Sequence, residues 1–289
     1  QGVDAVCIFV NDIADAEVLR IMASNGVKLL ALRCAGFNNV DLNAAAAAGI
    51  TVVRVPAYSP YAVAEYTVAL MLSLNRKIPR ASWRTKDGNF SLHGLMGFDM
   101  HGKTAGIIGT GKIAKILIHI LKGFGMNILA YDLYPDYNFA REEKIVYTSL
   151  DELYHSSDII SLHCPLTEAT KYLINDYSIS KMKDGVMIIN TGRGQLIHTN
   201  ALIEGLKNKK IGSAGLDVYE EESEYFYEDQ SDRIIDDDVL ARLLSFNNVI
   251  VTSHQAFFTH EALENIAMTT LQNIRDFINH KPLLNEVKK

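Results

Sequence analysis

The stretch Gly109-Thr110-Gly111-Lys112-Ile113-Ala114 follows the apolar run Thr104–Ile108 and opens a helical pattern. A strand that leads through a Gly-x-Gly turn into a helix offers free backbone N–H groups to a phosphate, and the glycines let the backbone approach it. The third position of the pattern needs a small residue for close helix–strand packing, and Ala114 meets that need. The stretch therefore predicts a dinucleotide-binding α/β fold.

An acidic residue stands where such a fold holds the ribose of the cofactor. Asp132 ends the next expected strand, about 20 residues after the turn. A carboxylate there binds ribose hydroxyls and repels a 2′-phosphate, and the following Leu133 and Tyr134 supply no compensating arginine. We therefore expect NAD, and not NADP, as the cofactor.

Outward from this turn, apolar runs alternate with helical patterns, which is typical of parallel strands joined by crossover helices. We expect two doubly wound parallel-sheet domains: a Rossmann-type NAD domain and a flavodoxin-like substrate domain. The NAD domain is expected at residues 59–253, and the discontinuous substrate domain at residues 1–58 and 254–289. The expected strands cover residues 5–10, 27–32, 50–55, 104–108, 127–131, 159–162, 186–190, 213–217 and 249–252.

Composition excludes several classes of protein. The 289 residues are 48% hydrophobic and 21% charged, as in ordinary globular domains, so whole-chain disorder is excluded. No apolar run reaches the roughly 18 residues of a membrane span, and we expect no secretory signal. The net charge of −6 disfavours a nucleic-acid partner. Three widely spaced cysteines, Cys7, Cys34 and Cys164, favour a reducing cytoplasm over a disulfide framework.

The helical pattern at residues 61–74 is apolar nearly all round. A helix without a polar face is buried, either inside its own domain or against a second subunit. We expect this helix in or beside a subunit interface, and hence a homodimer or a higher homo-oligomer. By contrast, residues 83–97 read as irregular.

Polar residues follow three expected strands at their carboxyl ends, where ligands bind in open α/β sheets. Arg193 lies in the stretch 190–194, an acidic run in 217–222, and His254 in 252–257. Taken singly, each signal is weak, because the arginine could form a surface salt bridge, the histidine could be structural and the glutamates could be solvated. Together they predict one site that combines a cation, an acid and a proton carrier.

At this point the chain resembles a known family, the D-isomer-specific 2-hydroxyacid dehydrogenases, and within it most closely the fermentative, NAD-dependent D-lactate dehydrogenases. The resemblance runs from about Ala5 to the C-terminus. The matching stretches are Leu32–Asp41, Val53–Pro60, Lys103–Gly106 running into the Gly-rich turn, Ser161–Thr167 and His254–Phe257.

The resemblance implies a role for each matching residue. Arg193 would bind the substrate carboxylate and polarise the keto group, and His254 would be the general acid or base. Glu222 would pair with His254 and favour its charged form, with Glu220 and Glu221 as alternatives. Substrate contacts would come from Arg193, His254, Ala35, Gly36, Tyr58 and Phe257. Cofactor contacts would come from Gly109, Thr110, Gly111, Lys112, Ile113, Asp132, His163, Cys164, Pro165, Thr191 and Asp217, and no metal is expected.

The implied activity is reversible hydride transfer between NADH and pyruvate, giving D-lactate. Two alternatives stay open: another D-2-hydroxyacid dehydrogenase, for a bulkier 2-keto acid or glycerate, or a non-enzymatic NAD-responsive corepressor of the same fold. Family members begin with additional strand–helix segments before the strand matched at residues 5–10. We therefore expect an N-terminally incomplete substrate domain.

Overall fold

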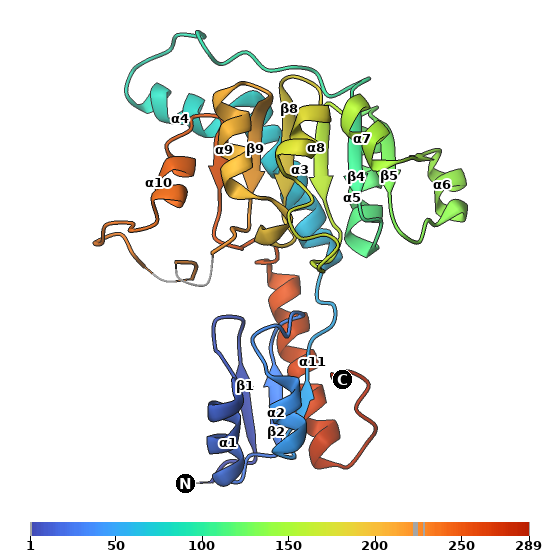
Figure 1. Cartoon of the computed structure of the whole chain (residues 1–289), viewed down its shortest axis with the longest axis vertical. Coiled ribbons are helices and arrows are strands. Elements are labelled where there is room, and N and C mark those ends of the chain that lie inside the picture. The colour runs from blue at the N-terminus through green and yellow to red at the C-terminus, as the bar shows by residue number, and fades with distance from the viewer. Residues whose placement is uncertain (1, 222–224, 228, 289) are drawn as a thin grey trace. The chain divides into compact units, whose positions relative to one another are not determined.

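The computed structural model describes residues 2–221, 225–227 and 229–288 as an α/β fold with two parallel sheets, which confirms the expected fold class. The chain forms two compact units, Gln1–Ser59 with Phe258–Lys289, and Pro60–Phe257 (Figure 1). The expected domain boundaries placed residues 254–257 with the substrate domain. In the structure they belong to the second unit, where the carboxylate of Asp217 accepts the N–H groups of Gln255 and Ala256.

The first unit has a three-stranded parallel sheet in the order β1-β2-β3 with helices on both faces. Alternate residues of β2 face opposite ways: Leu30 packs in the same core as Leu19 of α1, and Leu29 packs with Ile274 of α11. The elements are β1 Ala5–Ile8, α1 Ala16–Ser24, β2 Leu29–Leu32, α2 Leu42–Ala47, β3 Thr51–Val53 and α11 His260–Ile278.

The second unit has a seven-stranded parallel sheet in the order β10-β9-β8-β7-β4-β5-β6. The chain starts this sheet at β4, adds β5 and β6 on one side, and then crosses to β7 on the other side of β4. Ligands bind beyond the strand ends at such a switch point. The strands are β4 Thr104–Ile108, β5 Asn127–Tyr131, β6 Val146–Tyr147, β7 Ile159–Leu162, β8 Val186–Asn190, β9 Ile211–Leu216 and β10 Val249–Val251.

The helices of this unit cover both faces of the sheet (Figure 1). Side-chain caps fix several of their first turns: Asp237, for example, accepts from the N–H groups of Val239 and Leu240. The expectation that residues 83–97 are irregular was wrong for residues 83–86. They form the last part of α4, a helix that has Pro79 in its first turn. The helices are α3 Pro60–Arg76, α4 Ile78–Lys86, α5 Lys112–Gly123, α6 Tyr137–Glu143, α7 Leu150–Ser156, α8 Asp176–Lys181, α9 Thr199–Lys207 and α10 Asp238–Leu244, with the short 3₁₀ turn η1 Gly194–Leu196.

Helix α3 contains the apolar stretch 61–74 of the sequence, and many of its side chains are buried within its own unit. It packs across the strands that carry the site, β8, β9 and β10. The approach is close at Gly215 of β9, where an added Cβ would lie 3.0 Å from Leu74 and 3.3 Å from Leu70. Burial inside the unit is therefore a sufficient reason for the apolar face, and the subunit interface stays a prediction.

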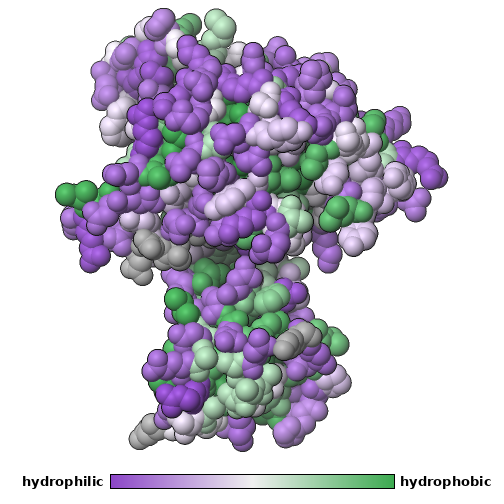
Figure 2. All heavy atoms as spheres, viewed as in Figure 1, coloured by the Kyte–Doolittle hydropathy of each residue, from purple (hydrophilic) through white to green (hydrophobic). Residues whose placement is uncertain are grey.

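The part of the chain that the structure describes has no helix that is both long and apolar enough to cross a membrane. On the face drawn in Figure 2, hydrophilic residues cover most of the surface and hydrophobic ones gather in small patches.

Candidate active site

The Gly-rich turn has the geometry that its sequence predicted. Gly109 has φ +88°, and a Cβ on it would lie 2.5 Å from the backbone nitrogen of Cys164, so only glycine fits. Gly111 is the N-cap of α5 without a side-chain cap, and a Cβ on it would meet nothing within 4 Å. The helix start is thus open to a phosphate at the switch point between β4 and β7. The residues present fit a dinucleotide.

Asp132 is held beside this turn by three hydrogen bonds. Its carboxylate accepts from Thr110 N at 2.6 Å, from Thr110 Oγ1 at 2.9 Å and from Tyr134 N at 2.9 Å. Desolvation raises the pKa of Asp132, but these hydrogen bonds outweigh it and leave the pKa below its ordinary value. A carboxylate has about four acceptor positions, so room remains for a ribose hydroxyl.

His163 and Cys164 lie at the end of β7, against Gly109. Burial lowers the pKa of His163 to about 4, and its Nε2 lies 2.8 Å from Ser161 Oγ, so the ring is neutral at pH 7. Burial raises the pKa of Cys164 to about 11, so its thiol stays protonated. Neither side chain brings charge to the turn, and both can serve as uncharged walls of a cofactor site.

Arg193 is presented by a turn that Asn190 closes at the end of β8. The buried Asn190 side chain accepts from Gly192 N at 3.0 Å and donates to Arg193 O at 2.8 Å. Gly194 allows close backbone contact, since a Cβ there would overlap the carbonyl of Tyr219. Arg193 donates to Gly192 O and has no carboxylate partner among the residues that the structure describes. Its guanidinium keeps donors for a ligand, since within the described residues no salt bridge occupies them.

His254 lies in a loop that Asp217 organises. Asp217 is fully buried at the end of β9 and accepts from Thr252 Oγ1 at 2.6 Å, Gln255 N at 2.9 Å and Ala256 N at 2.8 Å. Burial raises the pKa of Asp217, against the lowering effect of these hydrogen bonds. His254 N donates to Asp217 O at 2.7 Å, and His254 has φ +52°. The cofactor contact that the resemblance implies for Asp217 stays a prediction, and the structure shows that Asp217 holds the His254 loop.

The acidic segment after β9 supplies one described neighbour of His254. Tyr227 Oη donates to His254 O at 3.1 Å, and the two ring centroids are 6.1 Å apart. Glu220 is directed elsewhere, because its two oxygens accept from Tyr172 and from the backbone and hydroxyl of Thr199 at the start of α9. Glu222, the expected partner of His254, lies outside the described residues.

The first unit holds three of the expected substrate contacts. The backbone N–H groups of Ala35 and Gly36 donate to no acceptor in the described part of the chain, so they are available to a carboxylate. Arg54 fixes this loop by donating to Ala35 O at 2.8 Å. Tyr58 O accepts from Asn265 of α11 at 2.7 Å.

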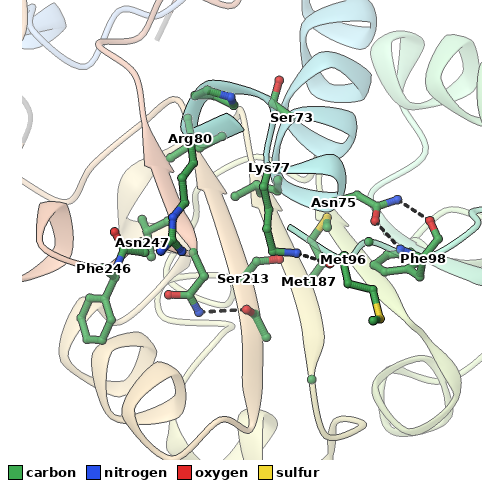
Figure 3. A pocket seen from close by; sticks show the side chains of 18 residues that line it. Ser73, Asn75, Lys77, Arg80, Met96, Phe98, Met187, Ser213, Phe246 and Asn247 are labelled. Carbon is green, nitrogen blue, oxygen red and sulfur yellow. Dashed lines mark hydrogen bonds between the residues drawn. The ribbon is translucent and has the colours of Figure 1, made fainter. Parts of the chain in front are cut away.

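The second unit has a sizeable cavity that is built from its own residues. Its volume is about 530 Å³, and it is lined by the amino ends of the strands, such as Gly212, and by Lys77 and Arg80 (Figure 3). None of the expected site residues lines it. In a parallel sheet the amino ends lie at the edge opposite to the ligand edge, so this cavity is not the active site. Across the described ranges, no cluster of His, Cys, Asp and Glu could hold a metal.

Within the second unit, the Gly-rich turn lies at the switch point of the sheet, and Arg193 and His254 follow β8 and β10, the two strands that flank β9. Residues 68–256 match the model of the D-isomer specific 2-hydroxyacid dehydrogenase, NAD binding domain. This chain belongs to the D-isomer-specific 2-hydroxyacid dehydrogenase family. The expected family is confirmed, and so is NAD as the cofactor of this oxidoreductase.

Full-length relatives agree. The chain is 55% identical over 287 residues to D-lactate dehydrogenase of Escherichia coli (strain K12), covering 99% of this chain and 87% of that protein. It is 58% identical over 271 residues to a 2-hydroxyacid dehydrogenase homolog of Haemophilus influenzae, covering 94% of this chain and 82% of the relative.

Solved structures superpose over nearly the whole chain. The apo-structure of D-lactate dehydrogenase from Escherichia coli gives a TM-score of 0.90 at 53% identity, covering 100% of this chain and 87% of that one. D-lactate dehydrogenase from Aquifex aeolicus, complexed with NAD and lactic acid, gives a TM-score of 0.85 at 37% identity, covering 96% of this chain and 83% of that one.

Sequence reasoning missed residues that hold the site without belonging to a chemical motif. Asn190 carried a usable signal, because an asparagine at a strand end often closes a turn by accepting from the backbone N–H two residues on, which here is that of Gly192. Thr252 and Tyr227 carried none, since their partners Asp217 and His254 are 35 and 27 residues away in sequence.

Proposed function

We propose that this protein is an NAD-dependent D-lactate dehydrogenase, which interconverts pyruvate and D-lactate. The observation that carries the proposal is Arg193: a half-buried guanidinium without a carboxylate partner in the described chain, at the ligand edge of an NAD-binding sheet. A planar guanidinium suits a substrate carboxylate. The names of the relatives from Escherichia coli support lactate as the product.

The roles of the residues follow from where charge develops. When bound, the reduced nicotinamide supplies the hydride that the keto carbon receives. Negative charge then develops on the keto oxygen, where Arg193 stabilises it and His254 delivers the proton. The products are D-lactate and NAD⁺, and the reverse reaction needs His254 neutral. Glu222, expected to pair with His254, completes this proposal.

The first unit contributes a second anion contact to the proposal. The N–H groups of Ala35 and Gly36, which donate to no acceptor among the described residues, would bind the substrate carboxylate, and Tyr58 would limit the size of the substrate. Phe257 would limit it from the second unit. Replacing Phe257 with Ala should improve the use of bulkier keto acids over pyruvate, since one methylene in such a pocket is worth roughly 1–3 kcal/mol.

One activity panel tests the function. Purified protein with NADH is offered pyruvate, 2-ketobutyrate, hydroxypyruvate and phenylpyruvate, and the loss of NADH absorbance is followed. We expect the highest kcat/KM with pyruvate and D-lactate as the product by chiral analysis. A preference for phenylpyruvate or hydroxypyruvate would instead support the bulkier-acid or glycerate alternative. No turnover despite NADH binding would support the corepressor alternative.

We also propose a cytoplasmic homo-oligomer. None of Cys7, Cys34 and Cys164 forms a disulfide in the described chain, which agrees with a reducing compartment. Sedimentation at micromolar concentration measures the mass of the protein in solution, and a monomeric mass would contradict the proposed homo-oligomer.

A further inference from the structure

Helix α3 contacts both catalytic loops through two consecutive residues, Tyr66 and Thr67. The helix is fixed to the sheet by its packing on β8, β9 and β10, with the close approach at Gly215. Residues of a helix turn by about 100° per position, so neighbours in sequence point in different directions. Tyr66 and Thr67 can therefore reach two different loops from one rigid support.

Thr67 holds the turn that presents Arg193. The Thr67 side chain is fully buried, and its Oγ1 lies 2.8 Å from Val63 O and 3.0 Å from Thr191 Oγ1. A hydroxyl has one proton, and the helix carbonyl can only accept it, so the Thr191 hydroxyl donates to Thr67. Thr191 is the residue after Asn190 in the same turn. The chain Thr191–Thr67–Val63 thus ties that turn to the helix.

Tyr66 holds the loop that presents His254. Gln255 Nε2 donates to Tyr66 Oη at 2.8 Å, while Gln255 N donates to the Asp217 carboxylate at 2.9 Å. The residue next to His254 is therefore anchored at its backbone by β9 and at its side chain by α3. Each loop thus donates a hydrogen bond to a side-chain hydroxyl of the helix, Thr191 to Thr67 and Gln255 to Tyr66.

We propose that Tyr66 and Thr67 are positioning residues that set the distance between Arg193 and His254 through one helix. The inference rests on the proposed function, since these two residues must meet the same substrate molecule. Residues that act together on one substrate must be held within about 0.5 Å of their productive positions. Loops that follow different strands can drift apart, and a shared helix with one hydroxyl for each loop limits that drift.

The experiment compares Thr67→Val and Tyr66→Phe, which remove one hydroxyl each and keep the shape. We expect Thr67→Val to raise KM for pyruvate and Tyr66→Phe to lower kcat, each roughly tenfold, since a full 1 Å misplacement costs about 10²-fold. Thr67→Ser keeps the hydroxyl and should restore wild-type values. The matched controls are Thr85→Val and Tyr61→Phe. Thr85 makes the same backbone hydrogen bond, to Ala81 O, on an exposed helix surface, and Tyr61 is an exposed tyrosine of α3.

Amide hydrogen exchange supplies a readout that does not need activity. Faster exchange is expected at Gly192 in Thr67→Val and at Gln255 and Ala256 in Tyr66→Phe, with α3 itself unchanged. Wild-type kinetics and exchange in both variants would overturn the proposal. So would faster exchange throughout the unit without rescue by Thr67→Ser, which indicates a packing role. If the wild type reduces no keto acid, the proposed function fails, while the exchange data still decide whether α3 holds the loops.

Discussion

The cofactor turn and the catalytic loops lie at the same carboxyl edge of one sheet, but different interactions hold them. The turn is fixed locally: Gly109 and the start of α5 are contiguous in sequence, and the next strand brings Asp132 to Thr110. The loops of Arg193 and His254 are held in addition by side chains from distant segments, such as Thr67 for Thr191, 124 residues away. The comparison implies that chemistry and cofactor binding can be damaged separately.

The largest expected effect breaks the chemistry and spares the cofactor. His254→Gln removes the proton carrier, and general acid–base catalysis contributes about 10²–10⁴-fold, so kcat for pyruvate reduction should fall by that factor. The Kd of NADH, measured by fluorescence titration, should stay close to that of the wild type, because other residues hold the Gly-rich turn. A large rise of this Kd with kcat retained would place His254 at the cofactor.

The second expected effect weakens cofactor binding more than the chemistry. Gly109→Ala introduces a methyl group 2.5 Å from Cys164 N at a φ of +88°. Backbone strain of this kind costs roughly 1–3 kcal/mol, so the Kd of NADH should rise about 10- to 100-fold, with a smaller change in kcat at saturating NADH. Gly123→Ala is the control, because a Cβ there meets nothing within 4 Å. Equal behaviour of the two variants would mean that the turn tolerates a side chain.

The same contrast explains what the sequence could predict. The turn at residues 109–114 and most strands of the second sheet follow from local patterns, because glycine, small residues and apolar runs act on their own neighbours. The short elements α6, β6, α7 and α8 were missed, since the two residues of β6 and the six or seven of each helix leave little periodicity. The anchors of the loops were missed for another reason. Thr67 and Tyr66 read as ordinary helix residues, and only the fold brings them to Thr191 and Gln255.

A third effect sharpens the cofactor side. Asp132→Ala should weaken NADH roughly tenfold, the loss of about one charge-assisted hydrogen bond of about 1.5 kcal/mol, and should relieve the exclusion of NADPH. Since Asp132 also holds Thr110, the ratio of the two cofactors is the decisive measurement. If Asp132→Ala keeps the wild-type preference for NADH over NADPH, the role of Asp132 is only to hold the Gly-rich turn. The kcat with saturating NADH should change little, because the catalytic loops are held by other residues.

The smallest effect comes from a carboxylate at the opposite, amino edge of the sheet, where no ligand is expected. Asp158 accepts from Thr104 N at 2.8 Å and from Lys183 Nζ at 3.1 Å. Desolvation raises its pKa, but the hydrogen bonds from Thr104 and Lys183 outweigh it, so the pKa of Asp158 is lowered. The folded state therefore favours the ionised form. The stabilisation is present above the unfolded pKa of about 3.9 and is lost as the pH falls through the lower folded value.

Asp158→Asn should thus lower the free energy of unfolding by about 1 kcal/mol at pH 7, and the difference from the wild type should shrink as the pH falls below about 4. Urea unfolding at pH 7, 5 and 3.5 measures it. Asp151→Asn, which breaks the more exposed ion pair with Lys181, is the control and should cost less. Pyruvate reduction and NADH binding at pH 7 should match the wild type in both variants. A loss of either would show that a carboxylate at the amino edge of the sheet affects the site, and that its role is not limited to stability.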